Sequence, residues 1–496
     1  MIGAARLVVV MPRAASGLLA LQIGARLGTF VLNQVLVRTA SPAVFGAANV
    51  QLELVLSTVL ALSREGTRAL MLRRQDALRR GDPMLHNLAL VPVWIGSVLS
   101  VVVGWAYVTY LAPAALWAQS GVAVPVSVAL YGLGAWLELW AEPLHTCALG
   151  LDAYVSIRVA MEAGGLAAKA VVTAVLLQPA CLAAMQRCVA AYVALSSEAC
   201  ALLAFAWGRV AYGAMVLLVG AVCLRGHARR WWWPTSAAAV WGDAPTRAFL
   251  RVTTGQAALK LVLTEGEKLA AARLTTLDEQ GAYALASNYG SLVARMLFQP
   301  LEESVRLRLS QGGEAAAWMS TLLRLHVLFG TGLVALAPPV AAPFLRLVAG
   351  PAWAHAAPIL GMYCWYVPVL GVNGVVEAFV QSVAPARVLR LYSYVLVAAS
   401  AVMVGVLASP VAEARMVVAN IASLSVRALA SSAYVAHVSR RPWDGVVPHA
   451  WVWSVLVACG AIVRAYPASW GVCAAACVAA VVVGERRALA QALWML

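Results

Sequence analysis

Charged and polar side chains recur inside the apolar stretches of this sequence, at spacings that place them on single helix faces. The clearest series is Asn288, Ser291, Arg295, Gln299, Glu302 and Arg306, with a kink expected at Pro300. The intervals of three or four residues match the turn of an α-helix, so these side chains share one stripe. A charged side chain at the centre of a membrane-spanning helix costs about 2.5–3.5 kcal/mol on insertion scales. We therefore expect this stripe to face a polar cavity rather than lipid.

Five further apolar stretches carry stripes of the same kind. They are Gln22, Arg26, Thr29 and Asn33; Glu138, Glu142 and His145; Thr253, Gln256, Lys260, Thr264 and Glu267; Tyr366, Asn373 and Glu377; and Asn420, Ser423, Arg427, Ser431 and Tyr434. Aligned stripes on several helices predict one shared polar cavity. The alternative is that some of these charges only join helices as ion pairs. Local pairs at helix ends, Glu65 with Arg68 and Glu303 with Arg306, favour that alternative.

The motifs of common enzyme classes are absent from the sequence. It has no G-x-x-x-x-G-K-[ST] loop for a nucleotide, and no HExxH motif or Cys/His cluster for a metal ion. All aspartates lie in predicted loops, and the loop after the first predicted helix spans only about residues 38–42. Membrane glycosyltransferases carry an acidic motif on a large first lumenal loop, which has no room here. We predict no catalytic residues, no metal and no cofactor, and a binding or transport protein rather than an enzyme.

The composition assigns the chain to membrane proteins. Of 496 residues, 62% are hydrophobic and 11% are charged, with a mean hydropathy of +0.82. A soluble globular chain is typically about 45–50% apolar and about 25% charged. The net charge of +15 would suggest nucleic acid in a soluble protein, but here the cations gather in short loops between apolar segments. The nine cysteines are scattered without a CxxC pair, so we interpret them as small buried apolar residues.

Apolar segments predict an all-α polytopic protein with about fourteen transmembrane helices. They cover roughly residues 14–37, 43–63, 88–111, 123–148, 155–178, 201–224, 248–271, 281–305, 319–341, 357–381, 387–408, 411–436, 448–465 and 468–484. Arginines concentrate in alternate loops, such as Arg64 to Arg80 and Arg225 to Arg247, and in the tail at Arg486 and Arg487. The positive-inside rule then places both termini in the cytosol. Residues 179–200 remain ambiguous between a lumenal loop and a re-entrant segment.

A short internal repeat suggests two lobes. Gly46-Ala47 opens one predicted helix and Gly281-Ala282 another, and each helix closes on a glutamate followed three residues later by an arginine. Internal repeats commonly build transporters with a site between the halves. We expect two six-helix lobes around a central cavity, at 1–224 and 248–437. A cytosolic linker at 225–247 would join them, and two C-terminal helices with a cytosolic tail would occupy 438–496.

Several runs resemble the Rft family of eukaryotic endoplasmic-reticulum membrane proteins. The most specific are Thr264 to Lys268, Ser291 to Arg295 and Phe298 to Ser304. Others are Ala14 to Leu19, Arg26 with Phe30 to Asn33, Ser63-Arg64-Glu65, Glu142-Pro143 and Asn373 to Glu377. The resemblance covers nearly the whole chain and departs at about residues 179–200, which look longer than the family's link between helices 5 and 6.

The resemblance implies both a fold and a function. The family belongs to the multidrug/oligosaccharidyl-lipid/polysaccharide exporter superfamily, with two six-helix lobes around a cavity. It implies flipping of the dolichyl-diphosphate-linked pentamannosyl-chitobiose from the cytosolic to the lumenal leaflet of the endoplasmic reticulum, for N-glycosylation. The partners would be this lipid and the bilayer, without nucleic acid or nucleotide. Two alternatives remain: a non-transporting accessory factor of the same pathway, and a cation-coupled antiporter, which Arg26 in place of an acid in the first helix disfavours.

For such a substrate, arginine and lysine would bind the diphosphate, and amide side chains would bind sugar hydroxyls. The candidate substrate-binding residues line the predicted cavity. They are Arg26, Asn33, Arg64, Arg68, Lys260, Glu265, Arg295, Gln299, Glu302, Asn373, Glu377 and Arg427.

Overall fold

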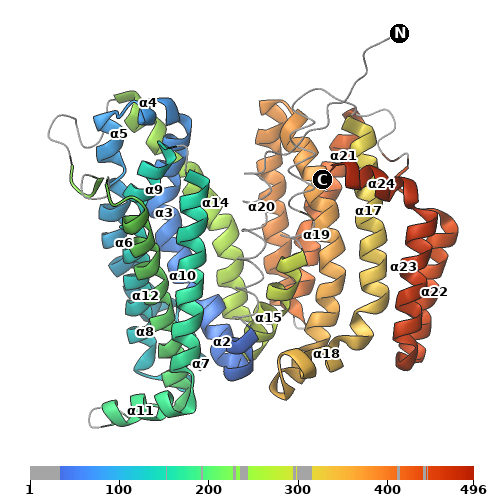
Figure 1. The fold of residues 1–496 in the computed structure, drawn as a ribbon, viewed down its shortest axis with the longest axis horizontal. Coiled ribbons are helices and arrows are strands. Elements are labelled where there is room, and N and C mark those ends of the chain that lie inside the picture. The colour runs from blue at the N-terminus through green and yellow to red at the C-terminus, as the bar shows by residue number, and fades with distance from the viewer. Residues whose placement is uncertain are drawn as a thin grey trace. The chain divides into compact units, whose positions relative to one another are not determined.

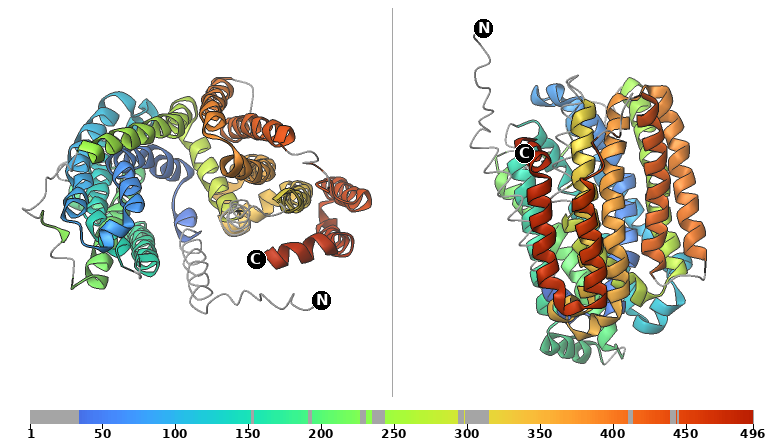
Figure 2. Two further views of the ribbon diagram at one scale, coloured as in Figure 1. Left: turned by 90° about the horizontal axis from the view of Figure 1, so that it is seen from above. Right: turned by 90° about the vertical axis from the view of Figure 1, so that its right-hand side faces the viewer.

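The computed structural model describes residues 34–151, 154–190, 194–226, 231–234, 244–293, 298, 315–409, 414–438, 443 and 445–495. Within these ranges every regular element is helical, which confirms the predicted all-α class. The chain forms two compact units, one made of residues 1–40, 55–112 and 117–259, the other of 41–54, 113–116 and 260–496. Each unit consists mainly of long helices (Figures 1 and 2).

The first unit packs around α12, which runs from Ser197 to Cys223. Its neighbours α8 (Ala123–Leu139) and α10 (Tyr154–Leu176) lie along it (Figure 1). The other elements of this unit are most of α3 (Leu52–Arg73), α4 (Gln75–Arg79), α5 (Pro83–Leu88), α6 (Val91–Ala106), η2 (Tyr107–Leu111), the end of α7 (Ala114–Ser120), α9 (Glu142–Leu149), α11 (Pro179–Val189) and the start of α14 (Ala244–Leu274).

The second unit packs around α19, which runs from Ala357 to Val383 and contacts both α17 (Ala315–Leu336) and α21 (Arg415–Val438). At the C-terminus, α22 (Ala450–Ala465) and α23 (Trp470–Gly484) form a hairpin, red in Figure 2. The unit also holds α2 (Pro42–Gly46), η1 (Ala47–Gln51), α15 (Leu277–Val293), η4 (Pro338–Val340), α18 (Ala341–Val348), η5 (Pro351–Ala356), α20 (Ala386–Ala408), η6 (Pro467–Ser469) and α24 (Arg486–Met495).

Ten helical segments of the described ranges are long and apolar enough to cross a membrane. They are Pro42–Leu72, Pro83–Leu111, Ala123–Leu149, Ser156–Leu176, Ser197–Cys223, Met319–Val348, Pro351–Gln381, Leu391–Ala408, Arg415–Val438 and Pro467–Gly484. The protein is therefore a multi-pass membrane protein.

Four of the fourteen predicted spans are missing from this set, for different reasons. The predicted span 14–37 lies almost entirely outside the described residues. The helix α14 (Ala244–Leu274) forms but is rich in charged residues, and α22 (Ala450–Ala465) is apolar but shorter than the others. The predicted span 281–305 is described as α15 only up to Val293. The count of fourteen thus remains a prediction.

Residues 179–200, which were ambiguous in sequence, contain a short helix. The helix α11 (Pro179–Val189) has 11 residues, too few to cross a bilayer, and it lies across the ends of α10 and α12 (Figure 1). Its side chains are half-buried or exposed where they are described. The long helix α12 then begins at Ser197, with the Ser196 hydroxyl accepting a hydrogen bond from the Ala199 backbone N–H.

The two glycines that revealed the sequence repeat pack directly against each other. A Cβ atom added to Gly46 would lie 2.6 Å from the backbone nitrogen of Gly281, and one added to Gly281 would overlap the Pro42 carbonyl. Beside this contact, the buried Gln51 side chain donates to the Gln280 side-chain oxygen and the Ala272 carbonyl, at 2.9 Å each. Small residues let the backbones of α2 and α15 approach closely, so the two copies of the repeat pack against each other at these glycines.

We predict that Gly46→Ala destabilises the second unit by about 1–3 kcal/mol, because the added methyl group overlaps backbone that cannot move aside. Thermal unfolding of the purified protein in detergent measures the loss. Gly405→Ala is the control, since Gly405 lies in α20 and nothing approaches its added Cβ within 4 Å. Equal midpoints for the two variants would contradict the packing.

Candidate functional site

The structure describes the side chains of five of the twelve predicted site residues. Arg64 and Arg68 lie in the first unit, and Asn373, Glu377 and Arg427 lie in the second. Arg26, Asn33, Arg295, Gln299 and Glu302 fall outside the described residues, and only the backbone of Lys260 and Glu265, both on α14, is described. The five described residues form two separate polar clusters, one in each unit.

The cluster of the first unit is a network of three arginines and two glutamates, which we call the N-cluster: Arg64, Arg68, Glu138, Glu142 and Arg209. Arg64 Nη1 lies 2.6 Å from Glu138 Oε1 and 3.4 Å from Glu142 Oε1. Arg68 donates two hydrogen bonds to Glu142, from Nη2 to Oε1 at 2.5 Å and from Nε to Oε2 at 2.9 Å. Arg209 pairs with the other oxygen of Glu138.

The chain places these groups by ordinary helix geometry. Arg64 and Arg68 are one turn apart on α3, so both point to the same side. Glu138 lies in the last turn of α8, and Glu142 begins α9 with Pro143 in the first helical turn. The two glutamates are thereby also about a turn apart, and each can meet one arginine of α3.

Glycines bring the third arginine of the N-cluster into position. A Cβ on Gly134 would lie 2.9 Å from the Arg209 carbonyl, and one on Gly213 would lie 2.5 Å from the Gly134 carbonyl. Because α8 and α12 approach so closely, Arg209 reaches Glu138 across the interface. Its guanidinium also lies 4.2 Å above the ring centre of Tyr212, a cation–π contact. Sequence periodicity does not single out Arg209, because it is the only charged residue of the predicted span 201–224.

The N-cluster has one more positive than negative charge, and its members differ in access. The side chains of Glu142, Arg209 and Glu138 are 4%, 8% and 9% exposed, whereas that of Arg68 is 30% exposed. The Arg64 Nε atom is buried without a hydrogen-bond partner. A buried ion pair that loses one member strands a charge at a cost of about 3–5 kcal/mol, so the inner pair Arg209–Glu138 chiefly holds helices together. The partly exposed Arg68 is the member that can reach a ligand.

The cluster of the second unit, the C-cluster, is electrically neutral and rich in amides: Asn373, Glu377, Gln381 and Arg427. Arg427 Nη2 lies 2.7 Å from Glu377 Oε2, and Asn373 Nδ2 donates to the same oxygen at 2.9 Å. Gln381 Nε2 donates to the other carboxylate oxygen at 3.1 Å. The Asn373 Oδ1 and Arg427 Nε atoms are buried without hydrogen-bond partners, whereas the Arg427 side chain as a whole is 30% exposed and Gln381 is exposed.

The two clusters repeat the same construction. Glu377 follows Glu138 at nearly the sequence separation by which Gly281 follows Gly46, within a few residues. Gln381 follows Glu142 at the same separation as Glu377 follows Glu138, so it occupies the corresponding position of the repeat. In both units a glutamate of this pair binds an arginine of the helix that follows two spans later, Arg209 on α12 and Arg427 on α21. A repeat visible in sequence as Gly-Ala thus extends to a glutamate–arginine pair.

The hydrogen-bonded partner of Arg68 lies far along the chain. Arg68 forms its ion pair with Glu142, 74 positions away, and Glu65 on its own helix adds electrostatic attraction. The spacing of three residues would allow a helix-end pair, but the carboxylate of Glu142 is better shielded from solvent and offers two bonds to one guanidinium.

Comparison with solved structures defines the class of protein. The fold is similar to that of the lipid II flippase MurJ in an inward closed conformation, with a TM-score of 0.63 and 8% sequence identity, over 96% of this chain and 99% of that one. Together with the ten candidate spans, this likeness defines a polytopic membrane protein with the fold of MurJ.

The sequence places the chain within one family. Residues 11–494 match the family described as Rft protein, and the chain belongs to it. Relatives named Man(5)GlcNAc(2)-PP-dolichol translocation protein RFT1 include those of Eremothecium gossypii, 31% identical over 77% of this chain and 73% of the relative, and Mus musculus, 28% identical over 87% and 84%. The relative from Saccharomyces cerevisiae is 28% identical over 77% of this chain and 74% of its own. These findings confirm the resemblance.

We predict that Arg209→Gln destabilises the protein by on the order of 3 kcal/mol, because Glu138 keeps a buried charge with only Arg64 beside it. The double variant Glu138→Gln/Arg209→Gln should recover part of this loss. Arg158→Gln is the control, since Arg158 and Glu162 form an exposed pair along one helix and such pairs contribute about 1 kcal/mol or less. Steady-state abundance and the thermal midpoint measure the effect, and a normal midpoint for Arg209→Gln would refute the structural role.

Proposed function

We propose that this protein translocates the dolichyl-diphosphate-linked pentamannosyl-chitobiose from the cytosolic to the lumenal leaflet of the endoplasmic reticulum, for protein N-glycosylation. The observation that carries the proposal is the match to the Rft family over residues 11–494, with relatives named for this translocation. The fold of a lipid flippase supports a transporter rather than an enzyme.

In this function the N-cluster binds the diphosphate. Its excess positive charge suits an anion, and Arg68 combines partial exposure with the planar fork that binds phosphate with two hydrogen bonds. A diphosphate would compete with Glu142 for this guanidinium. Arg26 and Arg295, predicted from sequence near mid-span, are the further candidates for the same anion.

The C-cluster binds sugar hydroxyls. It carries no net charge, the Arg427 side chain is 30% exposed and Gln381 is exposed. Hydroxyl groups are both donors and acceptors, so a mannose or N-acetylglucosamine unit can pair with both side chains. Glu377 is held in place by three hydrogen bonds and presents its oxygens in a fixed orientation.

We also propose the lobe division of residues 1–224 and 248–437, joined by a linker at 225–247 and followed by two helices and a tail at 438–496. The repeated glutamate–arginine pair supports six-helix lobes of common origin. The segment that contains α11 lengthens the first lobe, since Arg209 follows Glu138 by 71 positions, whereas Arg427 follows Glu377 by 50. The alternation of arginine-rich loops supports cytosolic N- and C-termini.

Reconstitution tests translocation directly. Purified protein in liposomes should move a labelled oligosaccharide-diphosphate polyprenyl lipid across the bilayer faster than empty vesicles do. The probe is added to one leaflet and scored by its accessibility to a membrane-impermeant lectin. Binding of the lipid without movement would overturn translocation and indicate a non-transporting accessory factor.

We predict that Arg68→Gln, Arg26→Ala and Arg295→Ala each weaken substrate binding about tenfold or more, since each removes a charge-assisted contact to the diphosphate. Lysine at each position should restore binding only in part, because a point charge lacks the guanidinium fork. The measurements are protein abundance and glycosylation of a reporter in cells that depend on each variant. Arg487→Gln, on the exposed face of α24, is the control. Normal glycosylation at normal abundance in all three variants would refute the anion site.

The proposed orientation predicts which turns face the lumen. Gly81 and Gly121 have positive φ angles of 76° and 47°, and nothing lies within 4 Å of a Cβ at either position, so both turns accept an insertion. A glycan-acceptor tag at Gly121 should be modified in microsomes, and the same tag at Gly81 should not. The reverse pattern would invert the topology.

A further inference from the structure

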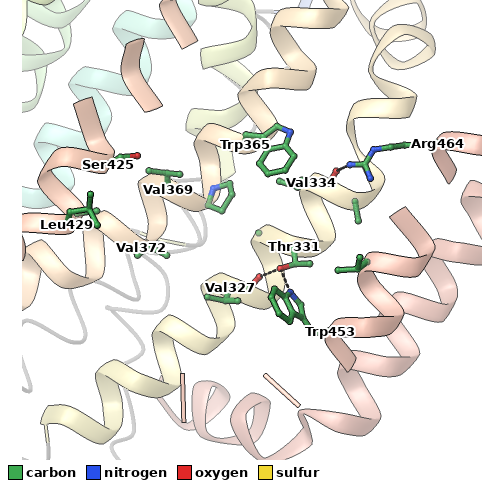
Figure 3. Close-up of a pocket in the computed structure, with 15 residues that line it drawn as sticks. Val327, Thr331, Val334, Trp365, Val369, Val372, Ser425, Leu429, Trp453 and Arg464 are labelled. Atoms are coloured by element: carbon green, nitrogen blue, oxygen red, sulfur yellow. Dashed lines mark hydrogen bonds between the residues drawn. The ribbon is translucent and has the colours of Figure 1, made fainter. Parts of the chain in front are cut away.

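The second unit contains a large apolar groove that the proposed substrate clusters do not use. Its volume is about 730 Å³, and its walls come from α17, α19, α21 and α22 (Figure 3). Among the described residues that line it, only Thr331, Ser425 and Arg464 are neither apolar nor tryptophan. None of the residues of the C-cluster lines it.

The groove opens on the outer surface of the unit rather than into its core. Lining residues are strongly exposed, among them Leu429 at 70% and Val457 at 54%. Leu429 lies two residues from Arg427 and therefore on another face of α21, and α22 is apolar apart from Arg464, so the medium that meets Leu429 and Val457 is lipid.

The walls of the groove are fixed. Trp453 Nε1 donates to the Thr331 hydroxyl at 3.2 Å, which ties α22 to α17 (Figure 3). Farther along, Glu485 pairs with Arg324 of α17 at 2.7 Å and accepts from the backbone N–H of His449, just before α22, at 2.8 Å. The groove is thus held open by polar contacts at its side rather than by its contents.

One cation marks one end of the groove. Arg464 lies in the last turn of α22, and its Nη2 donates to the Val334 carbonyl near the end of α17, at 3.2 Å (Figure 3). The side chain is exposed, and no carboxylate of the described residues lies within ion-pair distance of it. A guanidinium has five N–H groups, so most of its donors remain available to an anion at the membrane interface.

We propose that this groove binds one bilayer glycerophospholipid, with an acyl chain along the apolar walls and its phosphate on Arg464. At roughly 30 Å³ for each carbon-sized group, the share of volume that a water molecule takes, the groove holds about two dozen such groups. That capacity suits one acyl chain with its glycerol, whereas a very long isoprenoid exceeds it. The lipid fills a lipid-facing seam between α22 and the other three helices, and it is distinct from the transported substrate.

Native mass spectrometry of the delipidated protein tests this site. The probe is dioleoyl phosphatidylcholine, with dioleoylglycerol as its phosphate-free counterpart. The delipidated wild-type protein should bind one phosphatidylcholine, and Arg464→Gln should bind it about tenfold more weakly. Ala428→Trp, which fills the groove from α21, should weaken binding at least as much. Dioleoylglycerol should bind the wild-type protein and Arg464→Gln equally.

Two matched variants serve as controls. Ala461→Trp places the same bulk on an exposed position of α22 outside the groove, and Arg487→Gln removes an exposed arginine elsewhere. Both should bind the phospholipid as the wild type does, and thermal midpoints establish that the variants fold. Equal binding by Ala428→Trp and Ala461→Trp would overturn the site. Displacement of the phospholipid by a polyprenyl diphosphate would also overturn it and assign the groove to the substrate; the liposome assay of translocation does not depend on either outcome.

Discussion

A guanidinium group inside an apolar helix bundle needs a carboxylate, and this requirement organises the structure. The N-cluster joins three elements of the chain far apart in sequence through Arg64, Glu138 and Arg209. The C-cluster joins α19 to α21 through Glu377 and Arg427. Once buried, neither partner can be removed alone without stranding the other, so the pairs fix which helix faces meet. Apolar packing between helices in lipid cannot impose that specificity, because lipid is as apolar as the side chains.

The sequence predicted the helices and the polar faces but not most of the pairings. Periodicity identified Glu138, Glu142, Glu377 and Arg427 as one-sided polar residues, because helical spacing is local information. The partner of Arg68 lies 74 positions away on α9, and Arg209 is the only charged residue of the predicted span 201–224. The pairing of Arg209 with Glu138 depends on how α8 and α12 pack. That packing depends on Gly134 and Gly213, whose contact no spacing rule predicts.

The segment at 179–200 was ambiguous for a related reason. Its composition is apolar enough for a buried segment, and Arg187 and Glu198 suit a membrane surface equally well. In the structure α11 ends after 11 residues, too few to cross a bilayer, and Ser196 caps the next helix. The same short insertion hides the repeat. When the two halves are aligned so that Glu138 matches Glu377, the insertion moves Arg209 out of register with Arg427.

The carboxylates of the N-cluster bear on how a translocator can release its substrate. A diphosphate held by unopposed arginines in an apolar setting would be bound too tightly to leave, since charge-assisted hydrogen bonds strengthen as the local dielectric falls. In the N-cluster, Glu142 already satisfies two donors of Arg68 at 2.5 and 2.9 Å. A phosphate that displaces Glu142 gains only the difference in binding free energy between the two anions. When the phosphate leaves, the Glu142 carboxylate pairs again with the Arg68 guanidinium and neutralises its charge. In the proposed diphosphate site, ion pairs that stabilise the protein without its substrate would therefore limit the affinity for the diphosphate, as release in a transport cycle requires.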